Sequence, residues 1–82
     1  MQDFPIEELY RIMSEVFMQY DFAFRPDMGA KDVPGWDSLN HSVLMMDIGN
    51  ATGVDLSPEE TAKLPSIGAL HALILERMAQ LG

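Results

Sequence analysis

Three residues near the middle of the chain could support chemistry: Asp37, Ser38 and His41. A serine, a histidine and a carboxylate form a catalytic triad when the imidazole contacts the serine oxygen and the carboxylate lies behind the imidazole. Here Ser38 and His41 are three residues apart on one predicted helix, and Asp37 is next to the serine. No oxyanion hole or substrate pocket is evident in so short a chain. A small hydrolase is therefore the least favoured interpretation.

The position of Ser38 is more informative than its neighbours. The stretch from Gly35 to Leu39 lies where a long loop meets the start of a predicted helix. Backbone N–H groups in a first helical turn have no partner within the helix, and the helix dipole favours negative charge there. A phosphodiester on Ser38 would sit over these N–H groups. Asp37 would cap the helix and help to hold a magnesium ion during phosphoryl transfer. The alternative is that Asp37 and Ser38 are only a capping pair.

A first helix is predicted over residues 5–20, ahead of this site. Its apolar residues recur at the i, i+3, i+4 spacing of one helical face. Asp3 is expected to cap this helix, and Pro5 suits its first turn. Residues 21–37 then form a loop that is unusually long for such a chain. We expect its own apolar residues to tie it to the core: Phe22, Phe24, Met28, Val33 and Trp36.

Three further helices are predicted after the loop. One begins at Asp37 or Ser38 and ends at residues 52–53, where a glycine suits a left-handed stop. A short one begins at Ser57, with a proline at its first position and an S-x-x-E capping box, and it stops before Pro65. The last begins at Ser66. No segment is typical of a strand, so the fold class is all-α, with three longer helices and one short helix.

Composition narrows the classes of function. The 82 residues suit a single domain, 1–82, and carry a net charge of −8. This charge argues against nucleic acid or anionic lipid as partners. The chain has no cysteine, which excludes disulfides, thiolate zinc sites and a cysteine nucleophile. The acidic N-terminus is unlike a secretion signal, and no apolar run is long enough to span a membrane. We therefore expect a cytoplasmic protein.

No metal site is predicted. His71 lies among apolar residues of the last helix, where packing at the core edge is the default for a histidine. The loop acids Asp21, Asp27 and Asp32 are spaced too widely for a calcium-binding EF-hand loop.

The stretch Gly35-Trp36-Asp37-Ser38-Leu39-Asn40-His41 resembles the phosphopantetheine attachment motif of acyl carrier proteins, in which the serine of a D-S-L tripeptide is modified. The likeness continues to about Ile74 without a gap, and the long first helix and first loop match the family's layout. The resemblance implies a four-helix carrier-protein bundle with a long loop after the first helix. It also implies that Ser38 is the covalent attachment site, with Asp37 and Leu39 beside it in the cofactor-binding motif.

What the resemblance implies for function is carriage without catalysis, so the chain is not expected to be an enzyme. A phosphopantetheinyl transferase would move 4'-phosphopantetheine from coenzyme A to Ser38. The thiol of this arm would carry an acyl or aminoacyl group as a thioester. The implied partners are that transferase, a loading ligase or transferase, and a downstream synthase or transferase. The carrier itself is expected to be a monomer.

The partner surface implied by the resemblance is the second helix and its start, with Trp36, His41, Met45 and Asp47. Met45 could equally fill the core, since methionine at helical spacing usually does. Asp47 is the only acid between Leu39 and Thr52, whereas many fatty-acid carriers have an acidic second helix. A dedicated pathway, such as polyketide, nonribosomal peptide or surface-glycan acylation, is therefore favoured over housekeeping fatty-acid synthesis.

Two other interpretations remain open beside the acyl carrier. One is a peptidyl or aminoacyl carrier of a nonribosomal-peptide-type system, which D-S-L favours less because such motifs more often read G-G-H-S or G-G-D-S. The other is a small helical interaction module with no prosthetic group. Covalent modification of Ser38 separates the carriers from the interaction module.

Overall fold

A computed structural model describes residues 3–81 of the chain. In these residues four α-helices follow one another: α1 (Ile6–Phe17), α2 (Ser38–Thr52), α3 (Pro58–Thr61) and α4 (Ile67–Leu81). A single 3-10 turn, η1 (Ala30–Asp32), interrupts the long loop between α1 and α2. No strand occurs in residues 3–81, so the predicted all-α class is confirmed. None of the helices in this range is long and apolar enough to cross a membrane.

Helix α1 is shorter than predicted at both ends. Pro5 occupies the capping position and no side chain caps the helix, so the prediction of Asp3 as the cap is wrong. At the other end Met18 adopts a left-handed conformation with φ 57°, and its N–H and that of Gln19 both donate to the Ser14 carbonyl oxygen. The apolar spacing continues to Tyr20, but this left-handed residue ends the helix first.

The long loop is fixed to the rest of the molecule, as predicted. Val33 is buried, and Phe22, Phe24, Met28 and Trp36 pack against the core. Backbone hydrogen bonds tie the loop to the start of α4, because Ile67 and Gly68 donate to two loop carbonyl oxygens, each over 2.8 Å. The loop can therefore hold residues next to α2 in a defined position.

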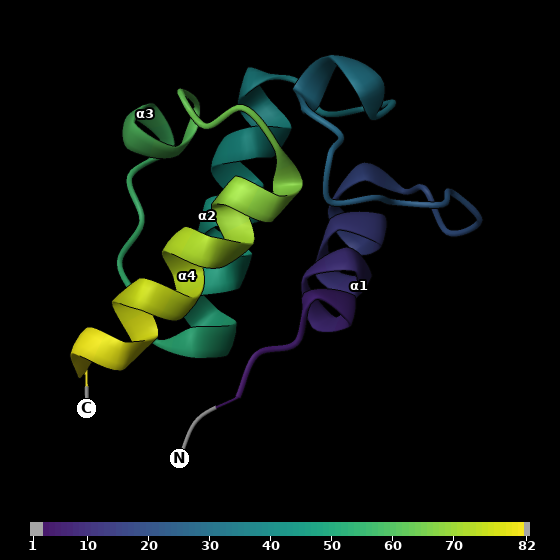
Figure 1. Ribbon diagram of the computed structural model, residues 1–82. Coiled ribbons are helices and arrows are strands. Elements are labelled where there is room, and N and C mark those ends of the chain that lie inside the picture. Colours follow the sequence, from purple (N-terminus) through teal and green to yellow (C-terminus); the bar gives the residue numbers. More distant parts are fainter. Residues whose placement is uncertain (1–2, 82) are drawn as a thin grey trace.

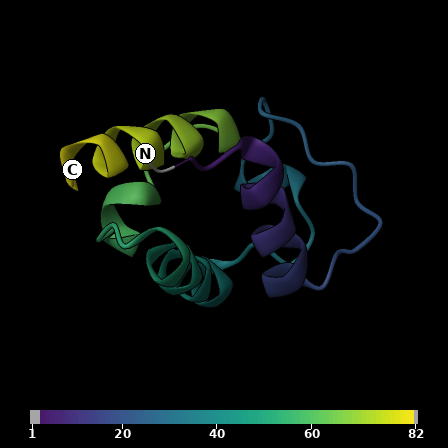
Figure 2. The same cartoon turned by 90° about the horizontal axis from the view of Figure 1, so that it is seen from below.

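Helices α1, α2 and α4 surround a common core, and α3 lies beside α2 and α4 (Figures 1 and 2). The side chains that are almost fully buried are Leu9, Met13, Leu44, Ile48, Ile67, Leu70 and Ile74. On the edge of this core the His71 ring nitrogen Nε2 lies 2.7 Å from the Phe4 carbonyl oxygen. The prediction that His71 packs at the core edge is confirmed.

The predicted starts of α2, α3 and α4 are confirmed by their caps, but the predicted capping box at α3 is only half formed, because the Glu60 side chain pairs with Arg77. The Asp37 carboxylate accepts from the Asn40 N–H over 2.8 Å, and the Ser57 hydroxyl accepts from the Glu60 N–H over 3.4 Å. The Ser66 hydroxyl accepts from the backbone N–H three residues later, over 3.2 Å. Helix α2 ends where predicted, at a left-handed glycine, Gly53, with φ 81°.

Candidate functional site

Ser38 is the first residue of α2, and its side chain is exposed to solvent. The chain turns into the helix at Gly35, whose φ is 84° and whose α-carbon faces the Phe17 carbonyl oxygen. The Asn40 side chain donates to the Gly35 carbonyl oxygen over 2.8 Å and fixes this turn from the helix side. Local backbone geometry therefore presents the Ser38 hydroxyl outward at a helix start.

The first turn of α2 keeps two open backbone donors. Within residues 3–81, the N–H groups of Ser38 and Leu39 have no acceptor. The start of α4 differs, because its first two N–H groups donate to carbonyl oxygens of the long loop. An anion attached to Ser38 would find free donors and the positive end of the α2 dipole.

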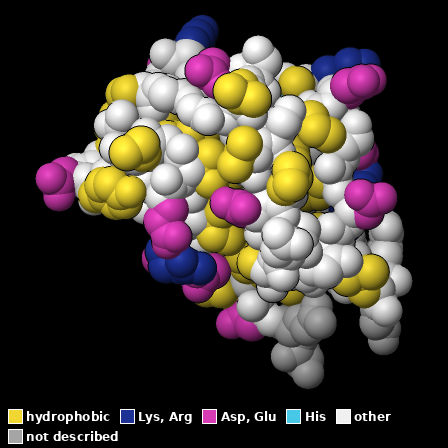
Figure 3. Space-filling model, turned by 180° about the vertical axis from the view of Figure 1, so that it is seen from behind, with side chains coloured by type: hydrophobic (Ala, Val, Ile, Leu, Met, Phe, Trp, Pro, Cys, Tyr) yellow, Lys and Arg dark blue, Asp and Glu magenta, His cyan; other side chains and the backbone are white. Residues whose placement is uncertain are grey.

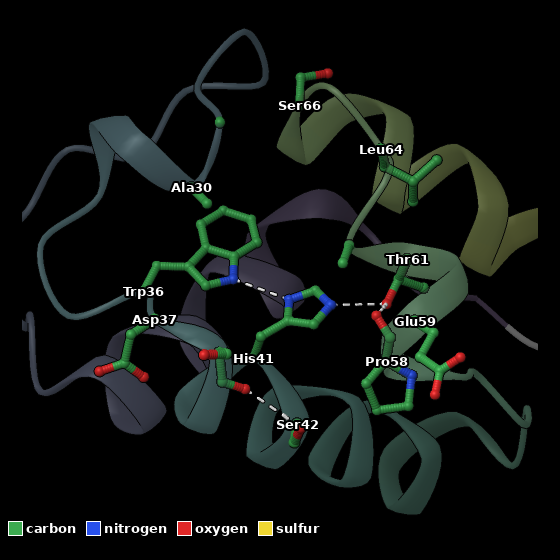
Figure 4. Close-up of a pocket in the computed structure, with 13 residues that line it drawn as sticks. Ala30, Trp36, Asp37, His41, Ser42, Pro58, Glu59, Thr61, Leu64 and Ser66 are labelled. Atoms are coloured by element: carbon green, nitrogen blue, oxygen red, sulfur yellow. Dashed lines mark hydrogen bonds between the residues drawn. The ribbon is translucent and has the colours of Figure 1, made fainter.

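A hollow of about 410 Å³ lies beside Ser38 (Figure 4). Four segments build it: the long loop, the first turns of α2, helix α3 and the segment that leads to α4. Its lining residues are Gly29, Ala30, Trp36, Asp37, Ser38, His41, Ser42, Pro58, Glu59, Thr61, Ala62, Leu64 and Ser66. Asp37 and Glu59 are the charged residues of this lining, and no lysine or arginine takes part in it.

Three side chains in this hollow form a continuous hydrogen-bonded bridge from the loop through α2 to α3 (Figure 4). The Trp36 indole N–H donates to His41 Nδ1 over 3.0 Å. Because indole can only donate, Nδ1 is the acceptor and the neutral imidazole carries its proton on Nε2. Nε2 therefore donates to Thr61 Oγ1 over 2.8 Å. We call this set of three residues the Trp36–His41–Thr61 bridge.

The bridge continues to backbone and leaves no polar atom unpaired. The Thr61 hydroxyl donates to the Ser57 carbonyl oxygen over 2.9 Å. Every buried side-chain nitrogen or oxygen in residues 3–81 has a hydrogen-bond partner. Burial lowers the pKa of His41, an effect that a backbone hydrogen bond at Pro58 partly opposes. The geometry and the pKa direction both favour the neutral imidazole.

His41 was predicted to lie on the surface or to contact the arm; the surface position is wrong, and contact with the arm stays a prediction. Its side chain is only 8% exposed, and it faces the hollow between α2 and α3. Both ring nitrogens are engaged, one by Trp36 and one by Thr61, so neither contacts Ser38. The arrangement is not that of a serine–histidine pair poised for nucleophilic attack.

Trp36 was predicted either to pin the loop or to contact the transferase. Its ring packs on Phe17 with ring centroids 5.5 Å apart, and its indole N–H donates to His41. The pinning role is therefore confirmed. The side chain also lines the hollow beside Ser38, and a contact with the transferase stays a prediction.

The two adjacent methionines of α2 point in different directions. Met45, predicted either to fill the core or to contact partners, is buried with 3% of its surface exposed. Met46 is 68% exposed. Burial removes Met45 from the predicted partner surface, because a buried side chain cannot meet a docking protein without unfolding part of the core.

The exposed face of α2 carries an apolar stripe formed by Leu39, Val43 and Met46. These residues are four and three positions apart, so they lie on one side of the helix. The predicted contact residue Asp47 is also exposed. Figure 3 views this face and shows hydrophobic side chains across its middle with acidic groups among and around them.

Sequence reasoning missed Thr61 and the Leu39–Val43–Met46 stripe as a unit. Thr61 lies twenty residues from His41, and nothing local in the sequence links them. The spacing did not single out this stripe, because apolar residues of α2 lie on both its buried and its exposed side. Comparisons with protein-family models, curated proteins and solved structures find no match to this chain.

Proposed function

We propose that the protein is an acyl carrier protein whose Ser38 bears a 4'-phosphopantetheine arm. The observation that carries this proposal is the placement of Ser38: exposed, first in α2, and next to two open backbone donors. The D-S-L motif and its likeness to the carrier-protein pattern point to the same residue. The arm would supply a thiol that holds acyl groups as thioesters, which a chain without cysteine cannot supply itself.

The residues around Ser38 fit such a group. The Ser38 hydroxyl would act as the nucleophile toward coenzyme A, losing its proton to a base on the transferase as the adenosine bisphosphate portion leaves. The N–H groups of Ser38 and Leu39 would then face the new phosphodiester. Asp37 has one carboxylate oxygen engaged in capping, which leaves the other for a metal ion in the transfer complex. In this proposal the chain carries groups between enzymes and is not itself an enzyme.

The proposed partner surface is the Leu39–Val43–Met46 stripe with exposed acids near it. A transferase, a loading enzyme and a downstream synthase would each bring an apolar patch edged by basic residues. Glu60 pairs with Arg77 and is therefore partly neutralised. Asp37, Asp47, Asp55 and Glu59 remain as exposed acids. This modest charge on α2 supports a dedicated biosynthetic pathway.

Intact mass tests the proposal. The purified chain is incubated with coenzyme A and a broad-specificity phosphopantetheinyl transferase, beside Ser38→Ala and Ser42→Ala. Ser42 is the matched control, because it lies one turn further along α2 and its hydroxyl makes only a 3.3 Å bond to the Ser38 carbonyl oxygen. We expect the wild type and Ser42→Ala to gain one 4'-phosphopantetheine, and Ser38→Ala to gain none.

A second candidate is a helical interaction module without a prosthetic group. The exposed Leu39–Val43–Met46 stripe favours it, since an apolar helix face edged by acids can dock a partner unaided. The same mass measurement separates the two: folded wild type that gains no mass with several transferases would favour the interaction module.

A further inference from the structure

The hollow beside Ser38 adjoins the core, and the Trp36–His41–Thr61 bridge lies between them. His41 comes from α2 and Thr61 from α3, and both side chains are almost fully buried. Figure 4 shows the imidazole spanning the distance between the indole and the threonine hydroxyl. A group that moved from the hollow into the core between α2 and α3 would have to pass this bridge.

Passing the Trp36–His41–Thr61 bridge would be unfavourable for an alkyl chain. The chain would have to separate α2 from α3 and break the 2.8 Å bond between His41 and Thr61. An imidazole N–H, and then a hydroxyl oxygen, would be left buried beside methylene groups that cannot form hydrogen bonds. The bridge therefore opposes entry of an apolar group more strongly than entry of a polar one.

The core on the other side of the bridge is already filled. Leu44 and Ile48 of α2 and Ile67 and Leu70 of α4 are buried, with relative exposures of at most 2%. Protein cores are close-packed, and added methylene groups force neighbouring side chains out of their preferred rotamers. A long chain would have to displace these residues as well as the bridge.

We propose that the cargo is compact, a short acyl or aminoacyl group that stays in the hollow, and that the Trp36–His41–Thr61 bridge excludes a long alkyl chain from the core. The statement about cargo rests on the proposed attachment at Ser38. The hollow, of about 410 Å³, has room for such a group beside the bridge. Its lining combines apolar side chains, among them Ala30, Trp36 and Leu64, with hydroxyl and carboxylate groups.

The test attaches the arm chemically, so that it does not depend on any transferase. The chain has no cysteine, so Ser38→Cys introduces a single thiol. Haloacetamide reagents that share one flexible linker and end in a butyryl or a decanoyl group are coupled to it. Iodoacetamide alone provides the control without an arm. Thermal unfolding reports chain burial, and fluorescence of Trp36, the only tryptophan, reports occupancy of the hollow.

We expect the butyryl arm to change Trp36 emission relative to the iodoacetamide control. We also expect the unfolding midpoints of the butyryl and decanoyl forms to agree within about 5 °C. Burial of the additional methylenes in the core would instead raise the midpoint of the decanoyl form by roughly 10 °C or more. A rise above about 5 °C, or unchanged Trp36 emission with the butyryl arm, would overturn the proposal.

A variant that lacks the His41–Thr61 hydrogen bond tests the bridge itself. The double change His41→Leu with Thr61→Val removes the imidazole and the hydroxyl that join α2 to α3, and leaves the half-buried Trp36 indole N–H as the remaining polar group of the bridge. In that background the decanoyl form should melt well above the butyryl form. Equal midpoints in the well-folded double variant would show that the bridge is not what excludes the chain. Failure of the native chain to accept phosphopantetheine would refute carriage at Ser38 but leave these chemical-attachment results unaffected.

Discussion

The His41 imidazole and the Thr61 hydroxyl lie 2.8 Å apart and join α2 to α3. Helix α3 has only four residues, which is too short for a helix that is stable on its own. Its position therefore depends on contacts with the rest of the molecule. The indole N–H of Trp36 fixes the tautomer of His41 and thereby the direction of the bond to Thr61. Three residues from three segments thus set the shape of the hollow beside Ser38.

Thr61→Val should destabilise the protein by about 1–3 kcal/mol, because an isosteric methyl group removes the hydroxyl that accepts from the buried His41 Nε2–H. Urea unfolding monitored by circular dichroism measures this change. Adding His41→Leu should recover part of the loss, since the buried imidazole N–H is then removed and only the half-buried Trp36 indole N–H loses its acceptor. Ser42→Ala, on the same helix, should change the free energy of unfolding by less than about 0.5 kcal/mol. Equal effects of Thr61→Val and Ser42→Ala would contradict the role given to the bridge.

The lowered pKa of His41 predicts a specific pH dependence. The unfolded chain takes up a proton on this histidine near pH 6.5, whereas the folded chain does so only at lower pH. The unfolded state therefore binds more protons between these values. The contribution of His41 to the free energy of unfolding is therefore fully present above about pH 6.5. It is lost as the pH falls through the pKa that His41 has in the folded state.

Urea midpoints of the wild type and His41→Gln, measured from pH 7.5 down to 5, isolate this contribution from that of the carboxylates. The difference in stability between the two proteins should shrink as the pH falls. A difference that is constant over the whole range would contradict the burial of a neutral His41.

The two methionines of α2 should respond differently to truncation. Met45→Ala should cost about 2–5 kcal/mol, because it leaves a cavity in the core. Met46→Ala should leave stability within about 0.5 kcal/mol of the wild type. If the Leu39–Val43–Met46 stripe meets partners, Met46→Ala should nevertheless slow phosphopantetheine transfer, measured as mass gain against time. Unchanged rates for Met46→Ala and Leu39→Ala together would argue against that surface.

Gly35 should be hard to replace. Its φ of 84° disfavours any side chain, and an added Cβ would lie 3.2 Å from the Phe17 carbonyl oxygen. Gly35→Ala should therefore cost about 1–2 kcal/mol from the backbone conformation, with a further cost from the close approach. Gly53→Ala is the matched control, because its φ is 81° but the nearest atom to a Cβ is a flexible leucine methyl 3.9 Å away. Thermal unfolding should place Gly35→Ala below Gly53→Ala.

Much of the fold could be predicted because its signals are local. The caps at Ser57 and Ser66 and the left-handed stop at Gly53 each depend on residues within a few positions of the helix end. The apolar residues of the long loop were expected in the core, because a loop of that length needs such contacts. The end of α1 was misplaced because Met18 takes a left-handed conformation that usually requires glycine.

The candidate site was predictable only in part. Ser38 and Asp37 could be found because the capping residue and the first residue of a helix can be recognised from the local sequence. The burial of the His41 side chain could not be predicted, because its partner Thr61 lies twenty residues away and is brought beside it only by tertiary packing. Nor could spacing assign Met45 to the core and Met46 to the surface, because apolar residues occur on both the buried and the exposed side of α2.

Attachment of 4'-phosphopantetheine at Ser38 is tested most directly by intact mass after incubation with coenzyme A and a broad-specificity transferase, followed by fragmentation of the peptide that holds residues 35–41. We predict a gain of one 4'-phosphopantetheine located on Ser38 and absent from Ser38→Ala. An unchanged mass in folded wild-type protein with several transferases, or a modification at another residue, would contradict the carrier function.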